Sequence, residues 1–592
     1  MDASQNSLRV LRALLLDVEQ STGVPTDRDF ARIRDRVRDE GLSFLTITLP
    51  AFCKAFELCL EEGICERSRF PGFRFSRGAP KFLGGLFALI FDGNGLLLSC
   101  PCVNSIMYVR QICLLYKKLE LPCSPEREQN AFRKYEECDD ELDTTIGIDL
   151  NAYSRVCALV LGPCLSKVDL DCYQDNLFPR FGPGAVAEKA TANGRYNVQE
   201  WPERLDAAFP LDVYRLASTD EEERSAIKLV PLEHELPVRI IHVPKTLKSP
   251  RIIAIEPSYM QYAQQGVMRL LYDALEGPSG LPCIRFTDQT VNRLHALSSS
   301  HSKSHATIDL SEASDRVRLD VVCAMLKQFP SLLAKVLACR STTAKLPDGK
   351  LVYLKKFASM GSALCFPIES MVFSTLIIYT MLKQSGKRPT TGRIKNLMRQ
   401  FCVYGDDIVV PTSWTQDVIT GLEVACLKVN ADKSFSKGNF RESCGMDAYD
   451  GFDITSRYIR HLEPNHITDV DAIDNWLSLS NEFHASGYWF VADYMKTVIE
   501  RICGRLPLGD GSAYLSLTTF QGVREGGRTS RTLHRPLIRA YGLVHKFRSD
   551  PLDGYGALRK FFLKSGKPLA KDHLRASGRP VSSQYKRRWF AV

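Results

Sequence analysis

Short β-type runs and longer helical patterns alternate in the middle of the chain. The runs VRIIHVP and PRIIAIEP, at 238–244 and 250–257, are rich in branched apolar residues and predict two strands. Apolar residues then recur at helical spacing over 259–275. The segment 306–329 predicts a strand that runs into a helix, and 350–361 predicts a strand followed by a loop.

The stretch FCVYGDDIVV, residues 401–410, predicts a β-hairpin with two acids at its turn. Glycine tolerates a positive φ and aspartate accepts local backbone hydrogen bonds, so the plain interpretation of Gly405-Asp406-Asp407 is a solvated turn. The alternative is a Mg²⁺ site, because carboxylates together with substrate phosphates are the usual ligands of this ion. A further carboxylate elsewhere in the chain would favour the second interpretation.

The segments before and after this centre have helical patterns. Residues 1–237 lean helical, as over 42–62, and a helical pattern with glycine-rich interruptions returns after about residue 458. An apolar helix is expected at 369–382, followed by a polar, basic stretch at 383–399. This arrangement predicts an α+β fold with a sheet core between helical regions.

Two loops, at 69–81 and 180–189, combine basic with aromatic residues. That composition suits RNA, whose phosphates pair with cations and whose bases stack on rings. Ordinary surface loops have the same composition, and the sequence does not decide between the two interpretations.

Composition is that of a globular protein. Of 592 residues, 44% are hydrophobic and 24% charged, and the length predicts several subdomains. The net charge of +9 is compatible with a polyanionic partner. We expect the C-terminal tail to contact RNA or a partner rather than to be merely solvated. From 559 to 588 it has a single acid, Asp572, and its bases include Lys560, Lys564, Lys567, Lys571, Arg575, Arg579, Lys586 and Arg587.

Several classes of protein are disfavoured. The nineteen cysteines include no CxxC pair, which predicts reduced thiols in a cytosolic protein. The N-terminus does not resemble a signal peptide, and the apolar run 371–382 is too short to span a bilayer, so we expect no membrane association. The motifs GxxxxGK[ST], HExxH and GxSxG are absent, which leaves metal-assisted nucleotide chemistry as the favoured class.

Asp309 is the candidate third carboxylate, since it ends the β-type run of ATIDLSEASD. An acid at a strand end beside the tip of a neighbouring hairpin could share two cations with Asp406 and Asp407. Without cations these three charges would repel one another, so the cluster makes physical sense as a metal site.

Basic and small residues fit the same chemistry. Lys245, Lys248 and Arg251 would line the path of a nucleotide triphosphate, or else form a solvated basic face. Lys433 could protonate a pyrophosphate leaving group, although a lone lysine usually lies at the surface. The small residues of 357–362 allow close approach to a flat group such as a base pair, or form an ordinary loop.

The order of motifs resembles that of the RNA replicase catalytic (beta) subunits of leviviruses, the positive-strand RNA bacteriophages such as Qβ. The motifs are PKTLKSPRIIAIEP, DQTVNR, ATIDLSEASD, LPDGK, SMGSALCFPIES, VYGDDIVVPT, NADKSF, FRESCG and YIRH, which together span about 238–461. The fragments FLTITLP and GPGAVAE extend the likeness upstream. The basic stretch 383–399 departs from the shorter family pattern.

The resemblance implies a right-hand polymerase fold with an antiparallel-sheet palm. The corresponding expectations are an N-terminal region at 1–237, mainly fingers with some helices that contact palm or thumb, a basic fingers segment at 238–305, a palm at 306–457, and a thumb with the basic C-terminal region at 458–592.

The resemblance also implies an activity and a set of roles. The chain would be an RNA-directed RNA polymerase, a nucleotidyltransferase that copies a phage positive-strand genome in the cytoplasm of an infected bacterium. Asp309, Asp406 and Asp407 would hold two Mg²⁺ ions, for which Mn²⁺ can substitute. The nucleotide would be bound and selected by these residues: Lys245, Lys248, Arg251, Asp315, Ser359, Met360, Gly361 and Ser362. The segment 440–445 would lie at the palm–thumb junction.

Template RNA and ribonucleoside triphosphates are the expected substrates. Family members also work with host elongation factors Tu and Ts and with ribosomal protein S-one, although no docking surface for them is visible in the sequence.

Two other functions remain open. A reverse transcriptase also uses a YxDD hairpin, but here Gly405 follows Tyr404, as in RNA polymerases, and Asp315 stands where an aromatic residue would exclude the ribose 2′-hydroxyl. A non-catalytic RNA-binding protein is disfavoured because an acidic triad opposes RNA binding unless metals intervene.

Overall fold

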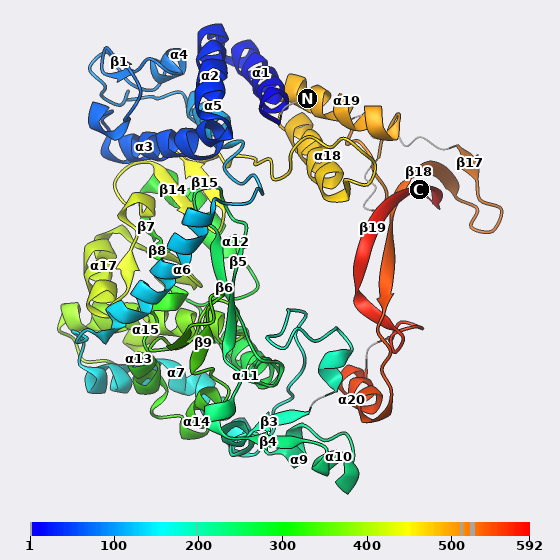
Figure 1. The fold of residues 1–592 in the computed structure, drawn as a ribbon. Helices are drawn as coiled ribbons and strands as arrows, with labels where there is room; N and C mark the ends of the chain where they lie inside the picture. Colours follow the sequence, from blue (N-terminus) through cyan, green and yellow to red (C-terminus); the bar gives the residue numbers. More distant parts are fainter. Residues whose placement is uncertain (1–2, 198, 510–512, 521–526, 567, 592) are drawn as a thin grey trace.

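A three-stranded antiparallel sheet carries the predicted hairpin. The computed structural model describes residues 3–197, 199–509, 513–520, 527–566 and 568–591 (Figure 1). In it β7 (His305–Ile308), β11 (Cys402–Tyr404) and β12 (Asp407–Pro411) run in the order β11-β12-β7. Tyr404 pairs with Asp407, and Ile408 pairs with Ile308. The hairpin is confirmed, and the register brings Asp309, the residue after β7, across from Asp407.

Two helices hold this sheet in place. α12 (Thr290–Ser302) contacts all three strands, and α15 (Cys365–Ser385) contacts β11 and α17 (Thr415–Val424). The apolar helix expected at 369–382 is therefore confirmed, with a longer extent. Its length and apolarity would suit a membrane span, but 89% of the apolar window is buried inside the protein, as in a core helix.

A second sheet presents the expected basic segment. β5 (Val238–Val243) and β6 (Arg251–Ile255) form an antiparallel hairpin, and β9 (Thr343–Lys345) and β10 (Leu351–Tyr353) extend the sheet in the order β10-β9-β5-β6. Both strands predicted here are confirmed. α11 (Ser258–Glu276) confirms the next helix, and α13 (Leu319–Leu326) confirms the helix that follows β7.

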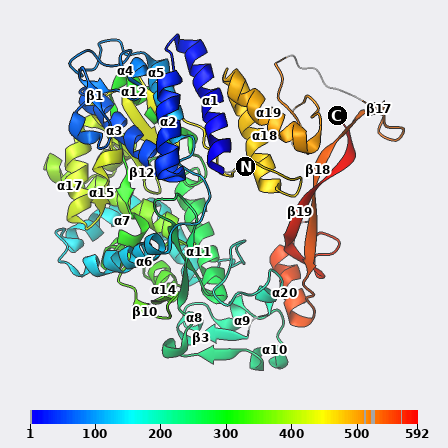
Figure 2. The ribbon, with the colours of Figure 1, turned by 45° about the horizontal axis from the view of Figure 1, so that its top comes forward.

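The N-terminal helices share a core with a distant part of the chain. Apolar side chains of 10–119 pack with those of 435–517, and α1 (Ala3–Thr22) lies against α19 (Trp489–Cys503) (Figure 2). A second core joins residues from 148 to 427. The division at 237, 305 and 457, with N-terminal helices that contact palm or thumb, stays a prediction.

The other helices and strands have the following bounds. The helices are α2 (Asp27–Glu40), α3 (Leu49–Glu62), α4 (Gly84–Phe87), α5 (Val103–Leu114), α6 (Pro125–Asp140), α7 (Leu150–Tyr173), α8 (Glu203–Asp206), α9 (Leu211–Tyr214), α10 (Glu221–Ser225), α14 (Pro330–Ala338), α16 (Thr391–Met398) and α18 (Val470–Ala485). The strands are β1 (Phe75–Ser76), β2 (Ala79–Pro80), β3 (Glu200–Pro202), β4 (Lys228–Val230), β8 (Leu310–Ser311), β13 (Lys428–Val429), β14 (Phe440–Ser443), β15 (Met446–Tyr449), β16 (Phe452–Asp453) and β17 (Arg528–Thr529).

The C-terminal region corrects the prediction of a helical pattern after residue 458. α18 and α19 are helical, but β18 (Pro536–Ser549) and β19 (Ala576–Ala591) form a long antiparallel hairpin arm, with α20 (Gly554–Lys564) at one end (Figures 1 and 2). Buried Ile538 and Ala540 alternate with exposed Arg539, the two-residue period of a strand. The basic tail residues lie on α20, on β19 and between them, except Lys567, which lies outside the described residues. Their contact with RNA or a partner stays a prediction.

Candidate active site

The hairpin turn needs glycine for two reasons. Gly405 has φ +59°, a conformation that side chains rarely adopt. A Cβ atom at this position would lie 2.4 Å from Cε2 of Phe366, on the first turn of α15. The backbone N–H of Gly405 donates to Ser370 Oγ at 3.2 Å, and the Tyr404 ring packs edge-on against Phe366. The turn is therefore seated on α15 and holds the acids in one place.

Asp309 lies between β7 and β8, where several groups hold its carboxylate. Asn430 Nδ2 donates to Asp309 Oδ2 at 2.9 Å, and Lys433 Nζ lies 3.5 Å from Oδ1. Burial raises the pKa of Asp309, and the negative charges of Glu442 and Asp406 add to this, while Lys433 and Asn430 oppose it. The charge of Asp406 affects the pKa of Asp309 although almost a hundred positions separate them in the sequence. The fold therefore brings these two predicted residues together.

Asp406 and Asp407 differ in their surroundings. Asp406 is exposed at the tip of the turn. The Asp407 carboxylate instead accepts hydrogen bonds from the backbone N–H of Cys444, at 3.0 Å, and from the Ser443 hydroxyl, at 3.4 Å. Burial raises the pKa of Asp407 to about 6; the Cys444 N–H opposes this and the charge of Asp406 adds to it. Asp407 therefore ties the hairpin to the turn between β14 and β15.

Carboxylates of this arrangement are suited to a divalent cation. Carboxylate oxygens are the donors that Mg²⁺ prefers, and a bound cation would relieve the mutual repulsion of Asp309 and Asp406. Among the residues that the structure describes, no three His, Cys, Asp or Glu side chains converge into a ready metal site. The donor chemistry thus fits for Asp309 and Asp406, and Asp407 is the less direct member of the predicted triad.

Two of the predicted cations face these acids. Desolvation lowers the pKa of Lys245, as do the charges of Arg251 and Lys433, while the charges of Asp406 and Asp309 act in the opposite direction. Burial tends to lower the pKa of Lys433, but the charges of Glu442 and Asp309 outweigh it and raise the pKa. Both ammonium groups therefore lie within the field of the carboxylates.

Lys248 and Arg251 are exposed, in the loop after β5 and at the start of β6. The charge of Arg251 acts on Lys245, which places both on the same basic surface.

Asp315 rests on a buried lysine. It lies in a short 3₁₀ turn, Ser314–Arg316, and Lys356 Nζ approaches its Oδ1 to 3.2 Å. The Lys356 side chain is 0% exposed; its ammonium also lies 3.6 Å from the centre of the Tyr135 ring and 3.9 Å from Asp139 Oδ1. α6 thus supports the residue that the resemblance assigns to ribose selection.

The loop with the predicted small residues packs on β6. The Tyr135 hydroxyl is 2.8 Å from Ser359 Oγ, Met360 O accepts from Ala254 N–H, and Ser362 N–H donates to Ser359 O. A Cβ atom on Gly361, whose φ is +137°, would lie 1.8 Å from Ala254 O. The close approach at Gly361 is therefore to the protein's own backbone, which differs from the expectation of a base pair.

Two acids at the site were not predicted from the sequence. Glu442 lies on β14, within the FRESCG motif. Its negative charge raises the pKa values of Asp309, Asp407 and Lys433. Glu369 on α15 is 7% exposed, and burial, together with the charge of Asp406, raises its pKa well above the usual range. A Cβ on Gly405 would lie 3.3 Å from Glu369 Oε1, so this acid lies directly beneath the turn. An acid within an apolar helix was the only signal available for Glu369.

Comparison with known proteins supports the motif-based resemblance. Residues 210–476 match the family model for the RNA replicase beta-chain. The chain is 35% identical over 224 residues to the RNA-directed RNA polymerase subunit beta of Qbeta virus (strain MX1), a match that covers 38% of this chain and 35% of that protein. It is 33% identical over 221 residues to the RNA-directed RNA polymerase beta chain of Escherichia phage MS2, covering 37% of each. The matched region thus spans about a third of the length of these relatives.

Among solved structures, the RNA-dependent RNA polymerase of a human picorbirnavirus aligns with 45% of this chain and 55% of its own, at 12% identity and a TM-score of 0.32. The α+β class with an antiparallel sheet at its centre is confirmed by the elements described above. Over residues 210–476, the predicted resemblance to the RNA replicase beta chains of leviviruses is confirmed.

Proposed function

We propose that this chain is an RNA-directed RNA polymerase, the catalytic subunit of a levivirus-type replicase. The observation that carries the proposal is that Asp309, directly after β7, and Asp406, at the tip of the neighbouring hairpin, lie within reach of each other's charge and of Lys245 and Lys433. Paired carboxylates beside cations suit the polyphosphate chemistry of nucleotidyl transfer. The names of the relatives, RNA-directed RNA polymerase subunit beta or beta chain, point the same way.

Asp309 and Asp406 would hold two Mg²⁺ ions, with Asp407 as a neighbouring charge or third ligand. The bound ions would activate the 3′-hydroxyl of the growing strand and neutralise charge on the α-phosphate and pyrophosphate. Manganese would substitute, since it accepts the same oxygen donors.

The protein's own side chains would bind the triphosphate, select the ribose and protonate the leaving pyrophosphate. Lys245, Lys248 and Arg251 would bind the triphosphate on the surface next to Asp406. Asp315 would accept a hydrogen bond from the ribose 2′-hydroxyl, since Lys356 and the buried end of α6 hold it in place. Lys433, whose ammonium lies 3.5 Å from Asp309 Oδ1, would give its proton to the leaving pyrophosphate.

The proposal extends to substrates, partners and domains. The chain would copy a phage positive-strand RNA in the cytoplasm of an infected bacterium. A relative named as a subunit suggests that the chain works within a complex. By the family resemblance, elongation factors Tu and Ts and ribosomal protein S-one would be its other members. Fingers at 1–237 and 238–305, a palm at 306–457 and a thumb with the basic region at 458–592 would complete the right hand.

The test is template-directed extension by purified replicase complex with Mg²⁺ and labelled ribonucleotides. We expect Asp406→Asn to reduce incorporation by orders of magnitude while RNA binding stays largely intact. Glu423→Gln, which removes an exposed acid on α17, is the matched control and should extend normally. Near-normal incorporation by Asp406→Asn, or preference of the unaltered complex for deoxyribonucleotides, would refute the proposal.

A further inference from the structure

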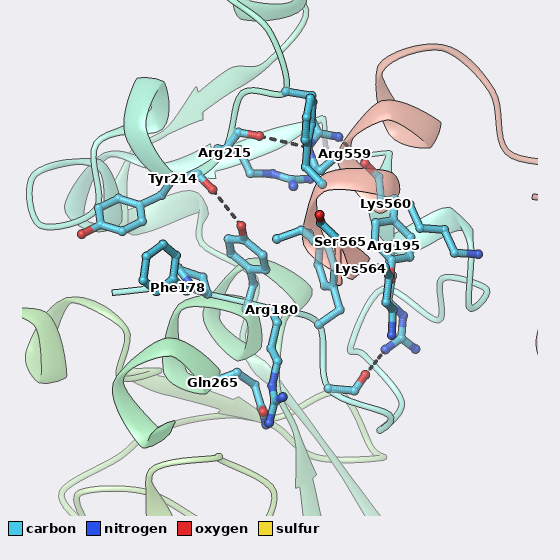
Figure 3. Close-up of a pocket in the computed structure, with 18 of the residues that line it drawn as sticks. Phe178, Arg180, Arg195, Tyr214, Arg215, Gln265, Arg559, Lys560, Lys564 and Ser565 are labelled. Carbon is cyan, nitrogen blue, oxygen red and sulfur yellow. Dashed lines mark hydrogen bonds between the residues drawn. The ribbon is translucent and has the colours of Figure 1, made fainter. Parts of the chain in front are cut away.

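A large cavity lies apart from the acidic site, where the C-terminal helix α20 meets the N-terminal half of the chain (Figure 3). Its volume is about 970 Å³, and it is bounded by residues 175–183, 192–196 and 213–217, by α11, and by α20 with the residues that follow it. None of the predicted catalytic or nucleotide-binding residues lines it. The first of these segments includes the start of the basic and aromatic loop 180–189, for which the sequence left RNA binding open.

The lining of the cavity is strongly cationic. Its single acid, Asp175, is neutralised by Lys335, whose Nζ lies 2.7 Å from Asp175 Oδ1. The positive charge of Arg269 adds to partial burial in lowering the pKa of Arg180, as expected for like charges held close together. The lining cations are Arg180, Arg195, Arg215, Arg269, Arg559, Lys560 and Lys564.

Arg215 is the most telling of these cations. It is 1% exposed, yet no nitrogen of its guanidinium has a hydrogen-bond partner in the part of the chain that the structure describes. The rings of Phe181 and Tyr262 lie 5.6 Å from it, and burial together with the charge of Arg559 lowers its pKa well below the usual range. A buried guanidinium without an anion is costly, and a carboxylate or phosphate is its natural partner.

Glu223 acts on Arg215 through its charge but makes no hydrogen bond to its guanidinium. Glu223 pairs with Arg559 Nη2, and it also accepts from the backbone N–H groups of Ala217 and Ser218. Arg559 in turn donates through Nε to Arg215 O at 2.9 Å. This network positions Arg215 and leaves its five N–H donors for a ligand.

Exposed aromatic rings border the same space. Phe178 is 73% exposed and Phe562, on α20, is 57% exposed, and both line the cavity. Large exposed rings beside cations are the usual means of holding a base and its phosphate together.

From this combination we propose that the cavity is a second nucleotide-binding site. Arg215 would bind a phosphate, with Arg180, Arg269 and Lys564 around it, and Phe178 or Phe562 would stack on the base. The phosphate would belong to an RNA strand or to a free nucleotide. The choice of nucleotides over other phosphates rests on the proposed function, whereas the site itself does not depend on the chemistry at Asp309 and Asp406.

The test is photocrosslinking of the full chain in EDTA, with the modified peptides identified by mass spectrometry. One arm uses a 4-thiouridine-labelled single-stranded RNA and the other uses azido-ATP, each with inorganic phosphate as competitor. We expect crosslinks on the peptides that contain Phe178 or Phe562 in at least one arm, and the arm that gives them identifies the source of the phosphate. The absence of crosslinks at these peptides in both arms would overturn the proposal.

Variants establish the role of Arg215. We expect Arg215→Met and the double variant Arg180→Gln/Arg269→Gln each to reduce crosslinking at the cavity at least tenfold. The control for the double variant is Lys395→Gln/Arg399→Gln, which removes the same charge from exposed positions, one on α16 and one directly after it. This control should leave crosslinking at the cavity unchanged. The ligand-free melting temperature of Arg215→Met should equal or exceed that of the unaltered chain, because an uncompensated charge has been removed. Undiminished crosslinking in folded Arg215→Met and in the double variant would refute the site.

A catalytic variant separates this proposal from the proposed function. Asp406→Asn should lose incorporation and keep the cavity crosslinks. Cavity crosslinks by the unaltered chain, in a replicase complex that shows no polymerase activity, would refute the proposed function and retain the site.

Discussion

Lys356 Nζ lies 3.2 Å from Asp315 Oδ1, and no part of the lysine side chain reaches solvent. The same ammonium group lies 3.9 Å from the carboxylate of Asp139, which is itself 1% exposed. One buried cation thus serves two acids from segments far apart in the sequence. It connects α6 to the turn that presents Asp315 to the expected ribose.

Removing this cation should destabilise the protein. Lys356→Met leaves Asp139 and Asp315 as buried or half-buried acids without a counterion, which typically costs about 3–5 kcal/mol. We expect a correspondingly lower free energy of unfolding in urea. The control is Lys355→Met, because the neighbouring lysine pairs with Asp140 and Asp143 at the surface, and its loss should change stability little. Equal unfolding midpoints for the two variants would contradict the buried pair.

Asp315 itself should govern the choice of sugar. Asp315→Ala removes the acceptor proposed for the 2′-hydroxyl, so the preference for ribonucleotides over deoxyribonucleotides should fall by tenfold or more, in line with the loss of one charge-assisted hydrogen bond. The ratio of kcat/KM for the two sugars measures this. A variant that loses activity equally with both would argue for a structural role of Asp315 instead.

Gly405→Ala tests whether the turn must be seated on α15. The new Cβ would meet Phe366 at 2.4 Å, in addition to the strain of φ +59°. Gly386 offers a matched control, since its φ is +60° and a Cβ there would meet nothing within 4 Å. We expect Gly386→Ala to cost about 1 kcal/mol through strain alone and Gly405→Ala to cost more and to impair incorporation. If Phe366→Leu partly restores Gly405→Ala, the contact is the cause.

The parts of the fold set by local pattern were predictable from the sequence. The hairpin at 401–410, α11 and the strands β5 and β6 follow from apolar periodicity and turn residues. The motifs also placed Asp309 and Asp406 together, because their order resembles a known family. The pairing of β18 with β19 was not predictable, since many residues separate the strands and only a few positions of β18 alternate in burial.

The sequence also did not predict which charged residues are buried. In the sequence, Lys356 and Arg215 look like any surface cation, and Glu369 is one acid in an apolar helix. What makes them distinctive is the set of distant segments that covers them: α6 over Lys356, α20 beside Arg215 and the Gly405 turn over Glu369. Such long-range contacts leave no periodic trace in the sequence.

The folding stability of the metal-free protein should depend on pH through Asp407. Its folded pKa of about 6 lies above the unfolded value of about 3.9, so the folded state binds the proton more tightly. Stability in EDTA should therefore fall as the pH rises from 4 to 6, by up to about 3 kcal/mol from this group, and stay lowered above pH 6. Asp309 and Glu369, whose pKa values are also raised by burial, act in the same direction.

Urea unfolding of the metal-free chain measures this effect. Asp407→Asn keeps an oxygen acceptor for Cys444 N–H but cannot ionise. The variant should be more stable than the unaltered chain at pH 7 and equal to it near pH 4. A stability difference that does not change with pH would contradict the raised pKa.

The two acids of the turn should not be equivalent in catalysis. Asp406 is exposed at the tip and acts on Asp309, whereas the Asp407 carboxylate is occupied by Cys444 N–H and the Ser443 hydroxyl. Asp406→Asn should therefore reduce incorporation more than Asp407→Asn does, by at least tenfold. Asp407→Asn should need more Mg²⁺ for half-maximal activity, because it removes a negative charge close to the ions without removing their first ligand. A larger loss from Asp407→Asn, with Asp406→Asn nearly active, would reverse the ranking and make Asp407 the principal ligand.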